Sequence, residues 1–136
     1  MKLAETTCVV DTLSLLESGD TLTLFYTMGT TLLIWYLRYD NFTRLINIPS
    51  YNLENAHTGL RGEWINFYSK NDVFGSPLKP DNENYDAVVS EDHQVNVGNI
   101  FTIWNPFSHT SYLTDNQVIK RIVEGLVRTW KDVNGR

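Results

Sequence analysis

Three stretches of the chain have the composition of β-strands, and each is followed by polar residues. Residues 21–28 (TLTLFYTM) are β-branched, leucine and aromatic residues that lie between two glycines. Residues 63–69 (EWINFYS) are mostly apolar and end at a polar KND. Residues 95–104 (VNVGNIFTIW) form a third such run, in which Gly98 is a candidate bulge. The pattern therefore predicts three strands with long connections between them.

Helical periodicity is strongest near the C-terminal end, over residues 114–133, where Thr114 or Asp115 can cap the first turn. Residues 3–16 show the same spacing over a shorter stretch, and residues 30–39 begin with threonines that can cap a short helix. Three helices are therefore expected. The last helix has its apolar residues in one row: Val118, Ile119, Ile122, Val123, Leu126 and Trp130.

Strands that alternate with helices predict an α/β fold with a largely parallel sheet. The length of 136 residues fits one domain, residues 1–136. Residues 40–62 and 75–86 are rich in Asn, Pro and Gly and are expected to be loops, of which the first is a candidate lid. Three strands are few for a parallel sheet, because such sheets are normally covered on both faces and extended by further strands. We therefore expect part of the fold to lie outside this sequence.

The composition of the chain limits the classes of protein to which it can belong. The apolar fraction of 42% suits a globular chain, and a net charge of −5 with scattered basic residues argues against a nucleic-acid partner. Cys8 is the only cysteine, which excludes an internal disulfide. The N-terminal residues do not resemble a signal peptide, and no run approaches the roughly 18 apolar residues of a membrane span. We expect a cytoplasmic protein.

No cofactor is predicted. The chain has no glycine-rich nucleotide loop, and its histidines and single cysteine show no zinc-ligand spacing. Residues 91–93 (EDH) could hold a cation, but a solvated polar turn is the simpler interpretation.

Two titratable residues follow predicted strands. Asp72 comes soon after the strand at 63–69, and His109 follows the strand at 95–104 within an aromatic-rich stretch, interrupted by Pro106, that we interpret as a loop. Functional groups in open α/β sheets gather beyond the carboxyl ends of the strands. An acid after one strand and a histidine after the next are the two supporting members of a nucleophile–His–acid triad. The acid orients the imidazole and stabilises its charged form, and the imidazole shuttles the nucleophile's proton.

Three segments, LFYTMGTTLLIWYLRY, GEWINFYSKNDVFGSPLKP and VNVGNIFTIWNPFSHTSYLTDNQVIKRI, are similar to the C-terminal half of bacterial lipase- and esterase-like serine hydrolases of the α/β-hydrolase fold. The resemblance covers nearly the whole chain and is best over residues 62–122. It implies a triad acid at Asp72, a triad base at His109, and a small-molecule carboxylic ester as the substrate of the intact enzyme.

The nucleophile of that family is missing. Its serine lies in a G-x-S-x-G turn between a strand and a helix, and this motif does not occur in the sequence. Residues 3–16 resemble the helix that follows this turn, so the serine would precede Met1. Ser14 lies within a predicted helix without flanking glycines, and Ser69, Ser76 and Ser108 flank the loops of the acid and the base, so none of them is the expected nucleophile. Thr30 falls at a structural turn of the family, where a cap is expected. We therefore expect a partial fold that is inactive alone.

Simpler interpretations stay open. His109 could be a hydrogen-bonded structural histidine, and Asp72 could be a turn residue, because Asn and Asp favour turns. The chain could then be a non-catalytic remnant or a subunit that associates through its exposed sheet edge. A truncated sheet leaves backbone groups and apolar surface uncovered, which favours self-association or binding of a complementary N-terminal half.

Overall fold

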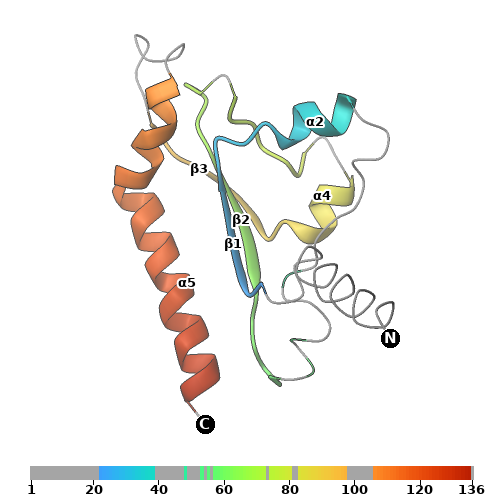
Figure 1. Ribbon diagram of the computed structural model, residues 1–136, viewed down its shortest axis with the longest axis vertical. Helices are drawn as coiled ribbons and strands as arrows, with labels where there is room; N and C mark the ends of the chain where they lie inside the picture. The colour runs from blue at the N-terminus through green and yellow to red at the C-terminus, as the bar shows by residue number, and fades with distance from the viewer. Residues whose placement is uncertain are drawn as a thin grey trace, which may run out of the picture.

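The computed structural model describes residues 22–38, 48, 53, 55, 57–72, 74–80, 83–97 and 106–135, without the side chains of residues 36 and 106–109. Its elements are, in chain order, β1 (Leu24–Met28), α2 (Leu32–Arg38), β2 (Glu63–Tyr68), α4 (Glu83–Val88), β3 (Glu91–Gln94), the 3-10 helix η1 (Pro106–Thr114) and α5 (Asn116–Asn134) (Figure 1). The helix predicted at residues 3–16 lies outside the described residues.

The predicted α/β class is confirmed, because the strands form one parallel sheet in the order β1-β2-β3. Thr27 of β1 lies beside Asn66 of β2, and Asn66 lies beside Asp92 of β3. Since all three strands run the same way, their carboxyl ends meet at one edge of the sheet. The loops that follow the strands are therefore brought close together at that edge.

The central strand β2 is covered on both faces. Ile65 and Phe67 are fully buried in one apolar cluster together with Tyr112 and Val118. Trp64, which points to the opposite face because side chains alternate along a strand, belongs to a second cluster. Figure 1 shows α5 on one side of the sheet and both α2 and α4 on the other. This is the layered arrangement expected of buried parallel strands.

The third strand of the sheet, β3, is Glu91–Gln94, which the sequence pattern did not predict as a strand. Val95 to Val97, the first residues of the strand predicted at residues 95–104, follow β3 without strand structure. The polar residues 91–93, interpreted above as a solvated turn, are therefore strand residues. Their polar side chains are stabilised by partners far away in the sequence: Asp92, for example, accepts hydrogen bonds from the backbone of Leu78 and Lys79. Residues 98–104 lie outside the described residues.

Two stretches expected to be loops contain helices. Residues 75–86 overlap α4, whose Tyr85 is buried against Trp64 with ring centroids 6.0 Å apart. This apolar anchor favours a helical turn in an otherwise polar stretch. The segment around His109 is the 3-10 helix η1 rather than a loop, since Pro106 opens this helix instead of breaking it. The helix α2 is confirmed within the predicted range 30–39.

The long C-terminal helix is confirmed, and Asp115 is its N-cap, accepting hydrogen bonds from the backbone of Gln117 and Val118. Only part of the predicted apolar row, however, faces the sheet. Val118 is buried and Ile122 packs on the core, whereas a row of side chains is 43% to 65% exposed. These exposed residues are Ile119, Val123, Leu126, Val127, Trp130 and Val133.

The orientation of α5 is set by charge and close packing. Arg121 and Arg128 turn toward the sheet and pair with Glu63 at 3.0 and 2.7 Å. Gly125, between the two arginines, is buried against the Tyr26 hydroxyl. A side chain on Gly125 would overlap with that hydroxyl, so glycine permits the approach. No helix of the described segments is both long and apolar enough to cross a membrane.

Candidate functional site

Asp72 is held in a tight turn directly after the central strand. Its backbone N–H donates to the carbonyl of Ser69 at 3.0 Å, and its carbonyl accepts from Gly75 at 3.1 Å. The carboxylate Oδ1 accepts a hydrogen bond of 3.0 Å from the backbone N–H of Phe74. Asp72 is only 4% exposed. Both of its backbone groups and one carboxylate oxygen are thus fixed within its own turn, at the carboxyl edge of the sheet.

The second oxygen of the carboxylate is bound by a residue from another element. The Tyr112 hydroxyl, in η1, donates a hydrogen bond of 3.0 Å to Asp72 Oδ2. Tyr112 is fully buried, and both this burial and the neighbouring negative charge of Asp72 raise the pKa of the phenol above its ordinary value. The hydroxyl therefore stays protonated and acts as a donor. Sequence reasoning missed Tyr112, because its contact with Asp72 spans 40 positions and no local pattern signals it.

Two glycines let three elements converge at Asp72. A Cβ on Gly75 would lie 3.0 Å from the Tyr112 hydroxyl, 3.1 Å from Asp72 Oδ2 and 3.2 Å from the Cα of Gly29. Gly29 follows β1, has a φ of 54° and donates its N–H to Phe67 at 3.0 Å. The turn after β1, the turn after β2 and η1 therefore meet within van der Waals contact around one carboxylate.

The second predicted site residue, the base His109, lies in η1 three residues before Tyr112. Its side chain lies outside the described part of the chain, so the pairing of Asp72 with His109 stays a prediction.

Two of the residues considered above as alternative nucleophiles, Ser69 and Thr30, have structural roles. The Ser69 hydroxyl is buried and donates to the carbonyl of Val97, which is a structural role. The Thr30 hydroxyl accepts from the N–H of Leu32 at the start of α2, so Thr30 is the expected cap.

The loop after Asp72 is anchored by the carboxylate of Asp92, which is partly buried. Asp92 of β3 accepts hydrogen bonds of 2.9 and 2.8 Å from the backbone N–H groups of Leu78 and Lys79. The amide of Asn66, also buried, bridges Asp92 at 2.7 Å and the carbonyl of Ser76 at 3.0 Å. These bonds give the polar side chains of Asn66 and Asp92 partners within the sheet and in the loop after Asp72. They fix the loop that begins at Asp72 along its length.

A charged cluster joins α5 to the opposite, amino-terminal end of β2. Burial alone would raise the pKa of Glu63, but hydrogen bonds from Tyr26 and Arg128 and the positive charges of Arg121 and Arg128 outweigh it and lower this pKa. The Tyr26 hydroxyl donates to Glu63 at 2.6 Å. Arg121 also pairs with Glu91 of β3 at 3.3 Å. Since each charged group has a partner across elements, the cluster is explained by its role in holding α5.

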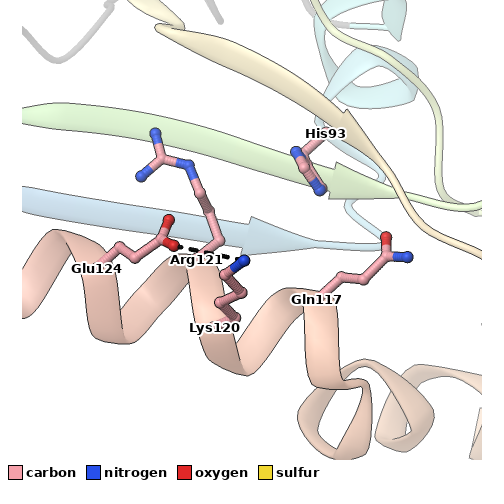
Figure 2. A pocket seen from close by; sticks show the side chains of 5 residues that line it. All are labelled: His93, Gln117, Lys120, Arg121 and Glu124. Carbon is pink, nitrogen blue, oxygen red and sulfur yellow. Dashed lines mark ion pairs between the residues drawn. The ribbon is translucent and has the colours of Figure 1, made fainter.

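A cleft of about 260 Å³ is lined by His93 of β3 and by four residues of α5: Gln117, Lys120, Arg121 and Glu124. Figure 2 shows these side chains. His93 Nδ1 lies 2.6 Å from Glu91, while Lys120 and Glu124 are 3.9 Å apart. Neither Asp72 nor Tyr112 lines this cleft. Across the residues that the structure describes, no group of three or more His, Cys, Asp or Glu side chains could hold a metal ion.

Comparison of the chain with protein-family models, with curated proteins and with solved structures gave no match. The functional argument therefore depends on the chemistry of the residues themselves.

Proposed function

We propose that this chain is the C-terminal part of a serine hydrolase that acts on carboxylic esters, with Asp72 as the acid and His109 as the base of its triad. One observation carries the proposal: the buried Asp72 carboxylate, at the carboxyl end of the central strand, is hydrogen-bonded to the helix that contains His109. A turn residue without further function needs neither the burial nor the contact with that helix.

The topology supports the same assignment. Asp72 follows β2, and η1 follows the neighbouring parallel strand β3, so the acid and the helix of the base belong to adjacent strands. Ligands of open α/β sheets bind beyond the carboxyl ends of the strands. The chain order of acid and then histidine is the order found in α/β-hydrolases.

In the proposed reaction, His109 removes the proton from a serine hydroxyl that lies outside this sequence. The serine oxygen attacks the ester carbonyl carbon, and the tetrahedral intermediate expels the alcohol, which takes the proton from His109. A water molecule, deprotonated by the same imidazole, then cleaves the acyl-enzyme to the carboxylic acid and free serine. Asp72 orients the imidazole and stabilises its charged form throughout.

The decisive experiment is the NMR titration of the histidines of the isolated chain, with His109 assigned through His109→Gln. If Asp72 contacts the imidazole, Asp72→Asn should weaken proton binding at His109 about tenfold or more, because a neighbouring carboxylate stabilises the imidazolium. Asp86→Asn, an exposed carboxylate on α4, is the matched control and should leave His109 unchanged. Equal titration midpoints in wild type and Asp72→Asn would rule out the proposed pairing.

A second experiment addresses activity. The isolated chain should not hydrolyse p-nitrophenyl acetate or butyrate above the buffer rate, because two triad members without a nucleophile retain little catalytic power. Turnover that is lost in both His109→Ala and Asp72→Ala would show that a nucleophile exists within this sequence.

A second candidate function is that of a subunit that binds another polypeptide chain. The exposed apolar row on α5, which includes Leu126 at 54% and Trp130 at 65% exposure, favours it. Contiguous apolar surface of this kind is typical of protein interaction sites. The two candidates are compatible, since a chain that supplies the serine would itself be a binding partner.

A further inference from the structure

We propose that Tyr112 is a positioning residue that fixes the Asp72 carboxylate in the orientation from which it binds His109. This inference rests on the proposed function, because it assumes that Asp72 and His109 form a pair. It goes beyond that proposal by assigning a role to a residue that belongs to no part of the triad.

The first argument is the geometry of the carboxylate. Phe74 donates to Oδ1 from the turn of Asp72 itself, and Tyr112 donates to Oδ2 from η1, each at 3.0 Å. Two donors on different oxygens restrict rotation of the carboxylate plane. An ionised carboxylate has about four acceptor sites, so hydrogen bonds from Phe74 and Tyr112 are compatible with an additional N–H donor such as an imidazole.

The second argument is the rigidity of Tyr112. The side chain is fully buried and packs in the cluster that contains Phe67, Val95 and Val118. Its hydroxyl donates to Asp72 and is also hydrogen-bonded to the backbone of Ser69. A phenol that only filled the core would need no oxygen at this point, and a buried hydroxyl is costly unless it is hydrogen-bonded. The oxygen is therefore explained by its contact with Asp72.

The third argument is the spacing along η1. A 3-10 helix has three residues per turn, so residues i and i+3 occupy the same face. Positions 109 and 112 are one turn apart in Pro106–Thr114. The residue that holds the acid and the residue proposed as the base thus belong to one short helix. One rigid element, rather than two independent loops, then sets the distance between acid and base.

The test is a double-mutant cycle on the titration of His109 in the isolated chain. Asp72→Asn is made in wild type and in the Tyr112→Phe background, and the loss of proton affinity at His109 is compared. We expect the effect of Asp72→Asn to fall from about tenfold to about threefold or less in the Tyr112→Phe background, because a freely rotating carboxylate stabilises the imidazolium less. A purely structural role of Tyr112 would lower the melting temperature and leave this ratio unchanged.

The outcomes separate the two proposals. If Asp72→Asn leaves His109 unchanged in wild type, both the triad pairing and the role of Tyr112 are wrong. If Asp72→Asn acts equally in both backgrounds, the pairing holds and the positioning role is wrong. Tyr68→Phe is the matched control, because it removes a hydroxyl that bonds the exposed Gln94 instead.

Gly75→Ala is a second route to the same contact, for the case that Tyr112→Phe does not fold. Its Cβ would lie 3.0 Å from the Tyr112 hydroxyl and 3.1 Å from Asp72 Oδ2, which forces the two apart while both side chains are kept. We expect the His109 titration midpoint to shift in the direction of Asp72→Asn. An unshifted midpoint in a folded Gly75→Ala chain would overturn the positioning role.

Discussion

Arg128 of α5 and Glu63 of β2 form an ion pair of 2.7 Å, in which the Glu63 side chain is 5% exposed. Arg121, two turns earlier on the same helix, binds the same carboxylate at 3.0 Å. A single buried carboxylate therefore binds two arginines that the helix turns toward the sheet, and Glu91 supplies a second negative charge to Arg121. This arrangement explains why α5 presents charged residues to the core and leaves much of its apolar row exposed.

Replacement of Glu63 by glutamine should destabilise the fold. Glu63→Gln keeps the shape of the side chain but leaves Arg121 and Arg128 without their shared partner, and breaking a buried pair from one side is costly. Because both arginines are about one quarter solvent-exposed, we expect a loss of about 2 kcal/mol in the free energy of unfolding by urea. Glu124→Gln, which removes an exposed carboxylate, should change it by less than about 0.5 kcal/mol.

The same cluster predicts how stability depends on pH. Despite desolvation, hydrogen bonds and neighbouring positive charges lower the pKa of Glu63 and of Glu91 in the folded state below the ordinary 4.5. The unfolded chain therefore binds more protons in acid, and the stabilisation is present above pH 4.5 and lost as the pH falls through the folded pKa values. The urea midpoint should drop steeply below pH 4.5. The difference between wild type and Glu63→Gln should shrink over this range, and a constant difference would contradict the pH linkage.

The sequence predicted those elements whose stabilisation is local. α5 has a side-chain cap at Asp115 and a long apolar period, and β2 lies in a mostly apolar run that ends at polar residues, so both were found. β3 was not predicted because its polar residues are satisfied by distant partners, such as Asp92 by the backbone of Leu78. No local pattern encodes such contacts.

In the candidate site, too, local sequence signals were predictive and contacts between distant residues were not. Asp72 was predicted from its position after a strand, and its location at the carboxyl edge of the sheet is confirmed. Tyr112 was missed because its bond to Asp72 spans 40 positions and depends on the close packing of Gly29 and Gly75. Only the folded backbone reveals that these glycines permit the contact.

Gly125→Ala should destabilise the fold, although alanine is the better helix former by about 1 kcal/mol. The added Cβ would overlap with the Tyr26 hydroxyl and approach Glu63, and overpacking of this kind typically costs about 1–3 kcal/mol. The melting temperature measured by circular dichroism should fall. Tyr26→Phe removes the hydroxyl, so the effect of Gly125→Ala should be smaller in that background. Equal effects in both backgrounds would show that the overlap with Tyr26 is not the cause.

The exposed apolar row of α5 predicts self-association of the isolated chain. Ile119, Val123, Leu126, Trp130 and Val133 are spaced by four, three, four and three residues, which is the spacing of a seam between two packed helices. Sedimentation velocity should show a mass that rises with protein concentration. Leu126→Lys introduces a charge at the centre of the row and should shift the protein toward monomer. Gln117→Lys adds the same charge at an exposed position outside the row and should leave the association unchanged. A concentration-independent monomer in the wild-type chain would contradict this use of α5, since the row would then be tolerated as ordinary exposed surface.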